Sequence, residues 1–181
     1  FMVSRYGPNG LDNITMLEGL QQYLAGSVEV VYAKGCATTN PGWPQTEIIP
    51  SPLSEEEVAG IDEAAALAAD CDVIIAVLGE DERTTGESRS RTSLDLPGRQ
   101  QQLLEALHAT GKPVVLVLVN GQPLTINWAD KHVPAILETW FPTYIGGPVV
   151  AQTLFGDRNP GGKLTVTFPK SVGQIEYNFP Y

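Results

Sequence analysis

Positive charge is scarce in this sequence of 181 residues. Lysine and arginine together number 11 against 21 acidic residues, which leaves a net charge of −10, and they form no cluster. Nucleic acids and anionic membrane surfaces attract proteins that carry a basic patch, so neither is an expected partner. The acidity alone is typical of a solvated surface and identifies no partner.

Cysteines and long apolar runs are also few. Cys36 and Cys71 have no metal-binding spacing and no CxxC motif, so both are expected to be buried free thiols. No apolar run reaches the roughly 18 residues that a membrane span needs, and no signal peptide is visible. The opening at Phe1 is unlike a natural start, so we expect a piece of a longer protein.

Several catalytic and phosphate-binding motifs are missing. The sequence has no GxxxxGK[ST] loop, no GxGxxG after a strand and no GxSxG elbow, which argues against a nucleotide site and against an α/β-hydrolase. The acidic residues match no calcium loop, and neighbouring arginines compete for the same oxygens. We therefore expect no metal and no cofactor.

Apolar runs and helical patterns alternate along the chain, which predicts an α/β fold with a mostly parallel sheet flanked by helices. Helices are expected over residues 16–24, after Ser54, after Pro97 and over 148–155, with a capping box formed by Ser54 and Glu57. Strands are expected at 28–33, 72–78, 114–119, 134–141 and 164–168. Sites in such sheets lie at the carboxyl ends of the strands.

A long polar loop follows the strand that ends at Leu78. Connections of this length are usually functional or disordered. The loops after Leu78, at Asn120 and at Trp140 each follow a strand, so we expect them to converge. The loop after Leu78 contains three arginines and four carboxylates: Glu80, Asp81, Glu82 and Glu87.

The residues of this loop leave two interpretations open. Arginines so close in sequence can pair with the acids, and a structural ion-pair network explains any one acid at least as well as catalysis does. The second interpretation is glycoside hydrolysis, because that reaction uses two carboxyl groups and sugar sites combine carboxylates with aromatic platforms. Trp140, Tyr144 and Trp43 are candidate platforms, although Trp43 in its proline-rich loop has the simpler role of burying that loop.

Seven blocks in a fixed order carry a resemblance to a known family. They are VLGE at 77–80, GESRSR at 86–91, LDLP at 94–97, TGKPVVLVLVNGQP at 110–123, ILETWFP at 136–142, LFGDRNPGGKL at 154–164 and FPKSVGQI at 168–175. The segment YAKGC at 32–36 fits as well. Together they resemble the second domain of glycoside hydrolase family 3, which contains β-glucosidases and related exo-glycosidases.

The resemblance implies an architecture. Residues 1–171 would form the α/β-sandwich domain, without its first strand, and 172–181 an extension toward a following domain. A preceding TIM-like barrel of the same parent protein would supply the nucleophile, and the site would lie between the two domains. Members of this kind are often periplasmic or secreted.

The resemblance also implies residue roles. Glu87 matches the general acid/base of a retaining exo-acting β-glycosidase, similar to a β-glucosidase or β-xylosidase, whose substrate is a β-linked glycoside. Glu80 and Arg91 would organise and anchor the loop, and with Trp140 and Trp43 they make up the expected substrate side. The chain alone would then be inactive. The alternative is a non-catalytic carbohydrate-binding or interaction module of the same fold.

Overall fold

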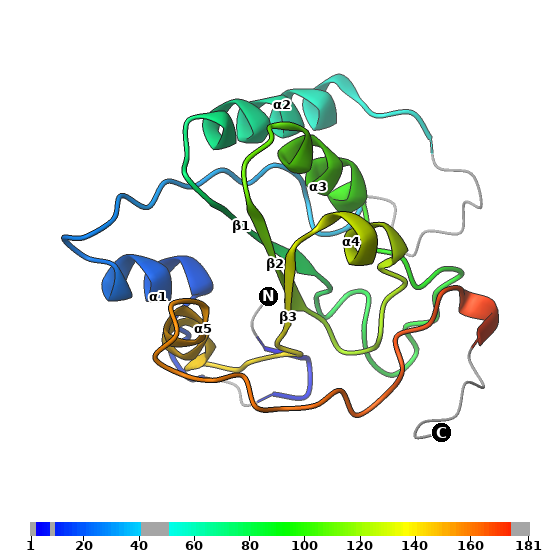
Figure 1. Cartoon of the computed structure of the whole chain (residues 1–181). Coiled ribbons are helices and arrows are strands. Elements are labelled where there is room, and N and C mark those ends of the chain that lie inside the picture. The colour runs from blue at the N-terminus through cyan, green and yellow to red at the C-terminus, as the bar shows by residue number, and fades with distance from the viewer. Residues whose placement is uncertain (1–2, 8–9, 41–50, 175–181) are drawn as a thin grey trace.

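A computed structural model describes residues 3–7, 10–40 and 51–174 and shows a parallel sheet between two layers of helices (Figure 1). The strands lie side by side in sequence order: β1 (Ile74–Gly79), β2 (Val114–Val119) and β3 (Ala135–Glu138). Both strand pairs are parallel. The predicted α/β fold is confirmed, and the carboxyl ends of all three strands meet at one edge.

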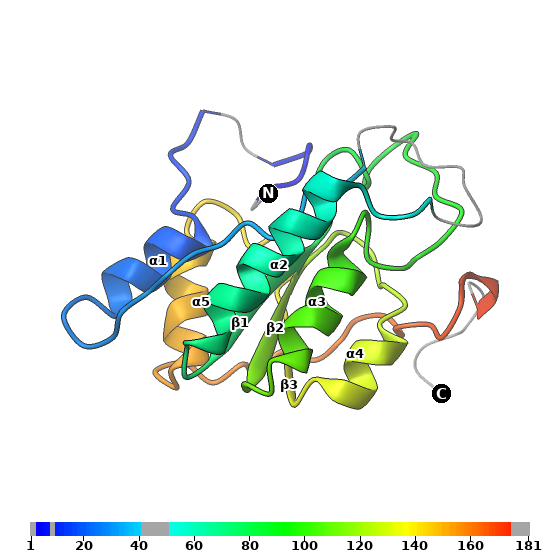
Figure 2. The same cartoon turned by 90° about the horizontal axis from the view of Figure 1, so that it is seen from above.

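Helices cover both faces of the sheet (Figure 2). On one face lie α2 (Glu55–Ala69), α3 (Gln100–Ala109) and α4 (Asn127–His132), and on the other lie α1 (Met16–Tyr23) and α5 (Gly146–Leu154). Because the strand order equals the sequence order, right-handed crossovers place α3 and α4 on the same face. A short 3-10 helix, Val172–Gln174, follows near the end of the described chain.

The strands bury side chains on both faces, as their unbroken apolar runs predict. On β1, Ile74, Ala76 and Leu78 join the core under α2, α3 and α4, while Ile75 and Val77 face α1 and α5. The alternation follows from the two-residue period of a strand. A core on each side therefore fixes the register of the sheet.

Two helices begin with reciprocal capping boxes. Ser54 Oγ accepts from Glu57 N, and the Glu57 carboxylate accepts from Ser54 N, which confirms the predicted box at the start of α2. Thr15 and Glu18 make the same exchange at the start of α1. Each box satisfies backbone N–H groups that the first turn leaves without partners.

Two expected strands do not form. Residues 28–33 join no strand of the sheet, and Val28 stays 54% exposed. At the end of β1, the Gln100 side chain accepts from Gly79 N at 2.6 Å and donates to Gly79 O at 2.7 Å. Residues 164–168 likewise find no partner strand, and Leu164 is 45% exposed. A segment with the composition of a strand becomes one only if it can hydrogen-bond to a neighbouring strand.

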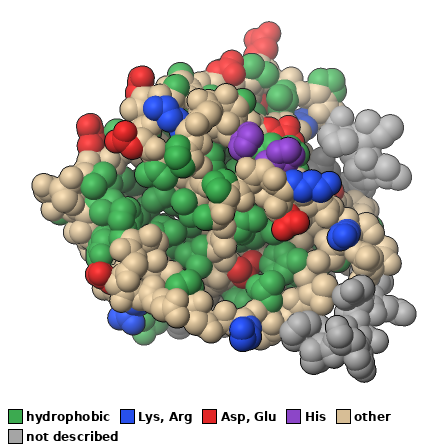
Figure 3. All heavy atoms as spheres, viewed as in Figure 1, with side chains coloured by type: hydrophobic (Ala, Val, Ile, Leu, Met, Phe, Trp, Pro, Cys, Tyr) green, Lys and Arg blue, Asp and Glu red, His purple; other side chains and the backbone are tan. Residues whose placement is uncertain are grey.

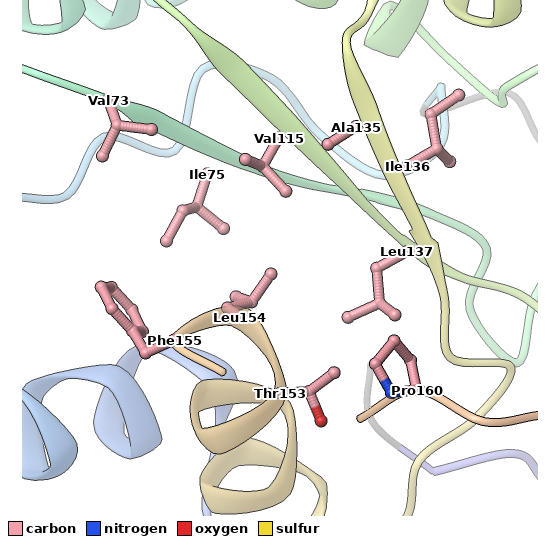
Figure 4. A pocket seen from close by; sticks show the side chains of 10 residues that line it. All are labelled: Val73, Ile75, Val115, Ala135, Ile136, Leu137, Thr153, Leu154, Phe155 and Pro160. Atoms are coloured by element: carbon pink, nitrogen blue, oxygen red, sulfur yellow. The ribbon is translucent and has the colours of Figure 1, made fainter. Parts of the chain in front are cut away.

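The amino-terminal half of the sheet opens on the side of α5. A hollow of about 330 Å³ lies there between the strands and the end of α5 (Figure 4), within a surface rich in hydrophobic side chains (Figure 3). Val115, Leu154 and Phe155 are among the lining residues, and none of those residues is titratable. The hollow therefore offers no group for acid–base chemistry. Among the described residues, no helix has the length and apolarity to cross a bilayer.

The close contact of α1 with α5 gives a test of the fold. A Cβ on Gly19 would lie 2.3 Å from the backbone carbon of Gly147. Gly19→Ala should lower the free energy of unfolding by about 1–3 kcal/mol, because overpacking outweighs the gain in helix propensity. Urea denaturation of the chain measures this change. In the control Gly162→Ala, the added Cβ meets nothing within 4 Å, and equal stability of the two variants would refute the contact.

Candidate active site at the carboxyl edge of the sheet

Glu80 is a fully buried carboxylate immediately after β1. Its Oε1 accepts from Arg91 Nη1 at 2.5 Å and from Gln122 Nε2 at 2.8 Å, and its Oε2 accepts from Gly121 N at 3.2 Å. The Arg91 side chain is 7% exposed and also donates to the Asp95 carbonyl. This one carboxylate therefore ties the loop after β1 to itself and to the loop after β2.

Gly121 lies where three loops meet. A Cβ at this position would be 2.2 Å from Thr85 Cγ2 and 2.8 Å from Phe141 Cε2. Thr85 belongs to the loop after β1 and Phe141 to the loop after β3, so a glycine between them lets the loops touch. The convergence expected from the topology is found in the structure.

A second ion pair lies further along the loop after β1. Asp81 Oδ2 accepts from Arg83 Nη2 at 2.6 Å and from Nε at 3.0 Å, and Asp81 Oδ1 accepts from Arg83 N. The Arg83 side chain is 52% exposed. Glu80 and Asp81, two of the four loop carboxylates, therefore form ion pairs, which was one of the two interpretations of this loop.

Glu87 is exposed, and its backbone is held from the amino-terminal segment. Arg5 Nη1 donates to Glu87 O at 2.9 Å, and Glu87 N donates to Tyr6 Oη at 2.5 Å. Gly86 and Ser88 on either side have φ values of 129° and 62°. Within the described part of the chain, no hydrogen bond or ion pair engages the Glu87 carboxylate. The amino-terminal segment therefore holds the backbone of Glu87 and leaves its carboxylate available.

The loop after β3 begins with a second polar anchor. Glu138 Oε1 accepts from Trp140 N at 2.7 Å, and Trp140 has a φ of 52°, in the left-handed region. Burial, reinforced by the Glu80 carboxylate, raises the pKa of Glu138 to about 7, although the bond from Trp140 N opposes the shift. The Trp140 ring is half-buried, 6.1 Å from the Phe168 ring.

Several residues in these loops have a left-handed backbone conformation. The non-glycine residues with positive φ among those described are Ser88, Trp140 and Thr143. Such strain persists where the surroundings over-determine it, and it is common at functional sites. Its position beside Glu87 and at Trp140 supports this edge as the site.

The predicted site residues are only partly brought together. Glu80 and Arg91 form one buried pair, and Glu87 and Trp140 lie on two of the converging loops. Trp43 lies outside the described residues. Sequence reasoning missed Asn120 and Glu138 as interacting strand-end side chains. A carboxylate inside the apolar run ILETWFP was the available signal for Glu138.

Residues 4–181 match the glycosyl hydrolase family 3 C-terminal domain. The chain belongs to this family. A division of the family 3 domain at residue 171 stays a prediction.

Named relatives and solved structures agree with this family. The domain is 41% identical to a β-xylosidase of Formosa agariphila over 92% of this chain, and 43% identical to a periplasmic β-glucosidase of Salmonella typhimurium over 90%. It spans 21% and 22% of those relatives. Both names denote glycoside hydrolases.

Two solved structures share its fold. A β-glucosidase of Erythrobacter marinus superposes with a TM-score of 0.81 at 41% identity, and one of Listeria innocua, in complex with isofagomine, with 0.76 at 34%. The matches cover 95% and 96% of this chain and 25% and 22% of those chains. Such enzymes contain much more chain than this domain.

The two ion pairs of the loop predict losses of stability of different size on mutation. Arg91→Ala should lower the free energy of unfolding by about 3–5 kcal/mol, because it leaves the buried Glu80 charge without its counter-ion. Arg83→Ala removes an exposed partner and should cost about 0–1 kcal/mol. Urea denaturation of both variants gives the comparison.

A double variant identifies the cause. Adding Glu80→Gln to Arg91→Ala removes the stranded charge and should recover part of the lost stability. Equal losses for Arg91→Ala and Arg83→Ala, or no recovery in the double variant, would contradict a stabilising buried pair.

Proposed function

We propose that this chain is the second domain of a retaining, exo-acting β-glycosidase similar to a β-glucosidase or β-xylosidase. Glu87 supplies the general acid/base, and a TIM-like barrel elsewhere in the parent protein supplies the nucleophile. The substrate is a β-linked glycoside or oligosaccharide. The parent acts in the periplasm or outside the cell, as the name of the Salmonella relative suggests.

The observation that carries the proposal is the division of the loop carboxylates. Glu80 and Asp81 hold the loop through ion pairs, whereas Glu87 offers an exposed carboxylate on a backbone fixed at both its N–H and its C=O. A group that transfers protons to a substrate must be positioned and accessible at once. Glu82 is exposed too, but the family resemblance falls on Glu87.

The reaction needs two carboxyl groups. The barrel nucleophile attacks the anomeric carbon while Glu87 gives its proton to the departing glycosidic oxygen, and a glycosyl-enzyme forms. Glu87, now a carboxylate, takes a proton from water as that water attacks the anomeric carbon and releases the nucleophile. The sugar leaves with its original configuration, and both carboxyl groups return to their starting states.

The chain alone lacks half of this site, so we propose that it hydrolyses no glycoside by itself. Its named relatives are four to five times as long, since it spans only 21–22% of them. That extra length favours an enzyme domain over a free-standing carbohydrate-binding module. We propose Trp140 as a sugar contact. Glu80 and Arg91 support the site indirectly, by holding the loops after β1 and β2 together.

Glu87→Ala in the full-length parent tests the acid/base role. With a poor leaving group, kcat/KM should fall about 10²–10⁴-fold, the usual contribution of general acid–base catalysis. With a good leaving group the first step needs less protonation, and added azide should restore turnover by attacking the glycosyl-enzyme. Steady-state kinetics on two aryl glycosides measures both effects.

Glu82→Ala is the matched control, because Glu82 is also an exposed carboxylate of the same loop. It should hydrolyse both substrates at nearly the parent rate. The assignment fails if Glu87→Ala keeps parent kinetics on the poor leaving group. It also fails if Glu82→Ala, and not Glu87→Ala, shows the loss of kcat/KM.

A further inference from the structure

The turn that carries Glu87 does not satisfy all of its own backbone. Gly86 O accepts from Arg89 N at 3.1 Å and so closes a four-residue turn, with Glu87 at its first corner. Ser88, at the second corner, has a φ of 62°, a conformation that glycine or asparagine adopts more readily. Because the turn's own hydrogen bond uses its two end residues, the N–H and C=O of Glu87 need partners from outside the turn.

Two consecutive side chains of the amino-terminal segment supply both partners. Tyr6 Oη accepts from Glu87 N at 2.5 Å, and Arg5 Nη1 donates to Glu87 O at 2.9 Å. The Arg5 guanidinium also lies over the Tyr6 ring, with its Cζ 5.6 Å from the ring centroid. Cation–π attraction therefore holds the two side chains to each other as they hold Glu87. We call Arg5 and Tyr6 the clamp.

Gly86 gives the clamp the space in which it approaches the turn. A Cβ at this position would lie 2.5 Å from Arg5 Cδ and 3.4 Å from Tyr6 Oη. Gly86 also has a φ of 129°, which residues with a side chain rarely adopt. The same glycine therefore permits both the bend of the loop and its contact with the clamp.

The clamp holds a different part of the loop from the buried ion pair. Glu80 and Arg91 pair at 2.5 Å and close the two ends of segment 81–90. The turn at 86–89 lies between those ends, and the clamp reaches it from about 80 residues away in the sequence. The orientation of the Glu87 carboxyl depends on the backbone of this turn, and a misplacement of about 1 Å can lower a rate about 10²-fold.

We propose that Arg5 and Tyr6 are positioning residues for the general acid/base: they hold the Glu87 turn so that its carboxyl keeps one orientation toward the glycosidic oxygen. The effect on catalysis rests on the function proposed above, in which Glu87 transfers the proton. The hold on the backbone of Glu87 does not depend on that function.

The kinetic test uses Tyr6→Phe and Arg5→Met in the full-length parent. Each substitution removes one hydrogen bond to Glu87 and keeps a side chain of similar size. With a poor leaving group, kcat/KM should fall about tenfold for each variant and about 10²-fold for both together, at nearly unchanged KM. With a good leaving group, kcat/KM should stay close to that of the parent, because cleavage then needs little protonation.

Tyr32→Phe is the matched control. Tyr32 is 64% exposed, as is Tyr6, and its hydroxyl bonds to no described residue, so this variant should keep parent kinetics on both substrates. An equal loss for Tyr6→Phe on both leaving groups, or no loss on the poor one, would overturn the positioning role.

A double-mutant cycle tests whether the clamp acts through Glu87. In the Glu87→Ala background the carboxyl is absent, so adding Tyr6→Phe should change kcat/KM on the poor leaving group by no more than about twofold. A further tenfold loss in that background would show that Tyr6 acts on the reaction by another route and would overturn the proposal.

Hydrogen exchange separates the clamp from the proposed function. In the full-length parent, the peptide that contains Glu87 should exchange faster in Tyr6→Phe than in the parent or in Tyr32→Phe, because the Glu87 N–H loses its acceptor. Equal exchange in all three proteins would refute the clamp, whatever the kinetics. If Glu87→Ala keeps parent kinetics on the poor leaving group, the proposed function fails, and the exchange result alone decides whether the clamp exists.

Discussion

The site depends on one buried carboxylate, that of Glu80. It comes directly after β1 and is fully enclosed, so its charge must be met inside the protein. Arg91 from the same loop and the Gly121–Gln122 segment from the next loop meet it. The long polar loop is thus closed onto the sheet at a point 11 residues along its course. Without this pair, the loop that carries Glu87 would lose its buried attachment to the sheet and would keep the contacts from Arg5 and Tyr6.

The same edge of the sheet holds carboxyl groups in three different states. Glu80 is buried and paired with Arg91, Glu87 is exposed, and Glu138 is partly buried and has no cation as a partner among the described residues. The surroundings of each carboxyl group, rather than its residue type, therefore distinguish these three glutamates. The proposed half of a two-carboxyl site needs one accessible carboxyl group on a held loop, and Glu87 supplies it. The length of the family 3 relatives leaves room for the other half.

Sequence patterns predicted the parts of this molecule that depend on local chemistry. The buried strands β1 and β2 and the capping box at Ser54 follow from runs and spacings that need no distant partner. The strand predicted at 28–33 was wrong, because a strand forms only where a neighbouring strand offers hydrogen-bond partners. The helix α4 was not predicted, because it is a single short helix without a side-chain cap. The raised pKa of Glu138 could not be predicted from the sequence, since it depends on burial and on Glu80 at another strand end. The family resemblance singled out Glu87, which residue chemistry alone left among four acids.

The most direct test is one distance in a crystal structure of the full-length parent with a glycoside-mimicking inhibitor. The account predicts that the Glu87 carboxyl lies about 5–5.5 Å from the carboxyl of the barrel nucleophile, the separation that retaining enzymes use. A Glu87 that points away from the inhibitor, with another acid at that distance from the nucleophile, would contradict it.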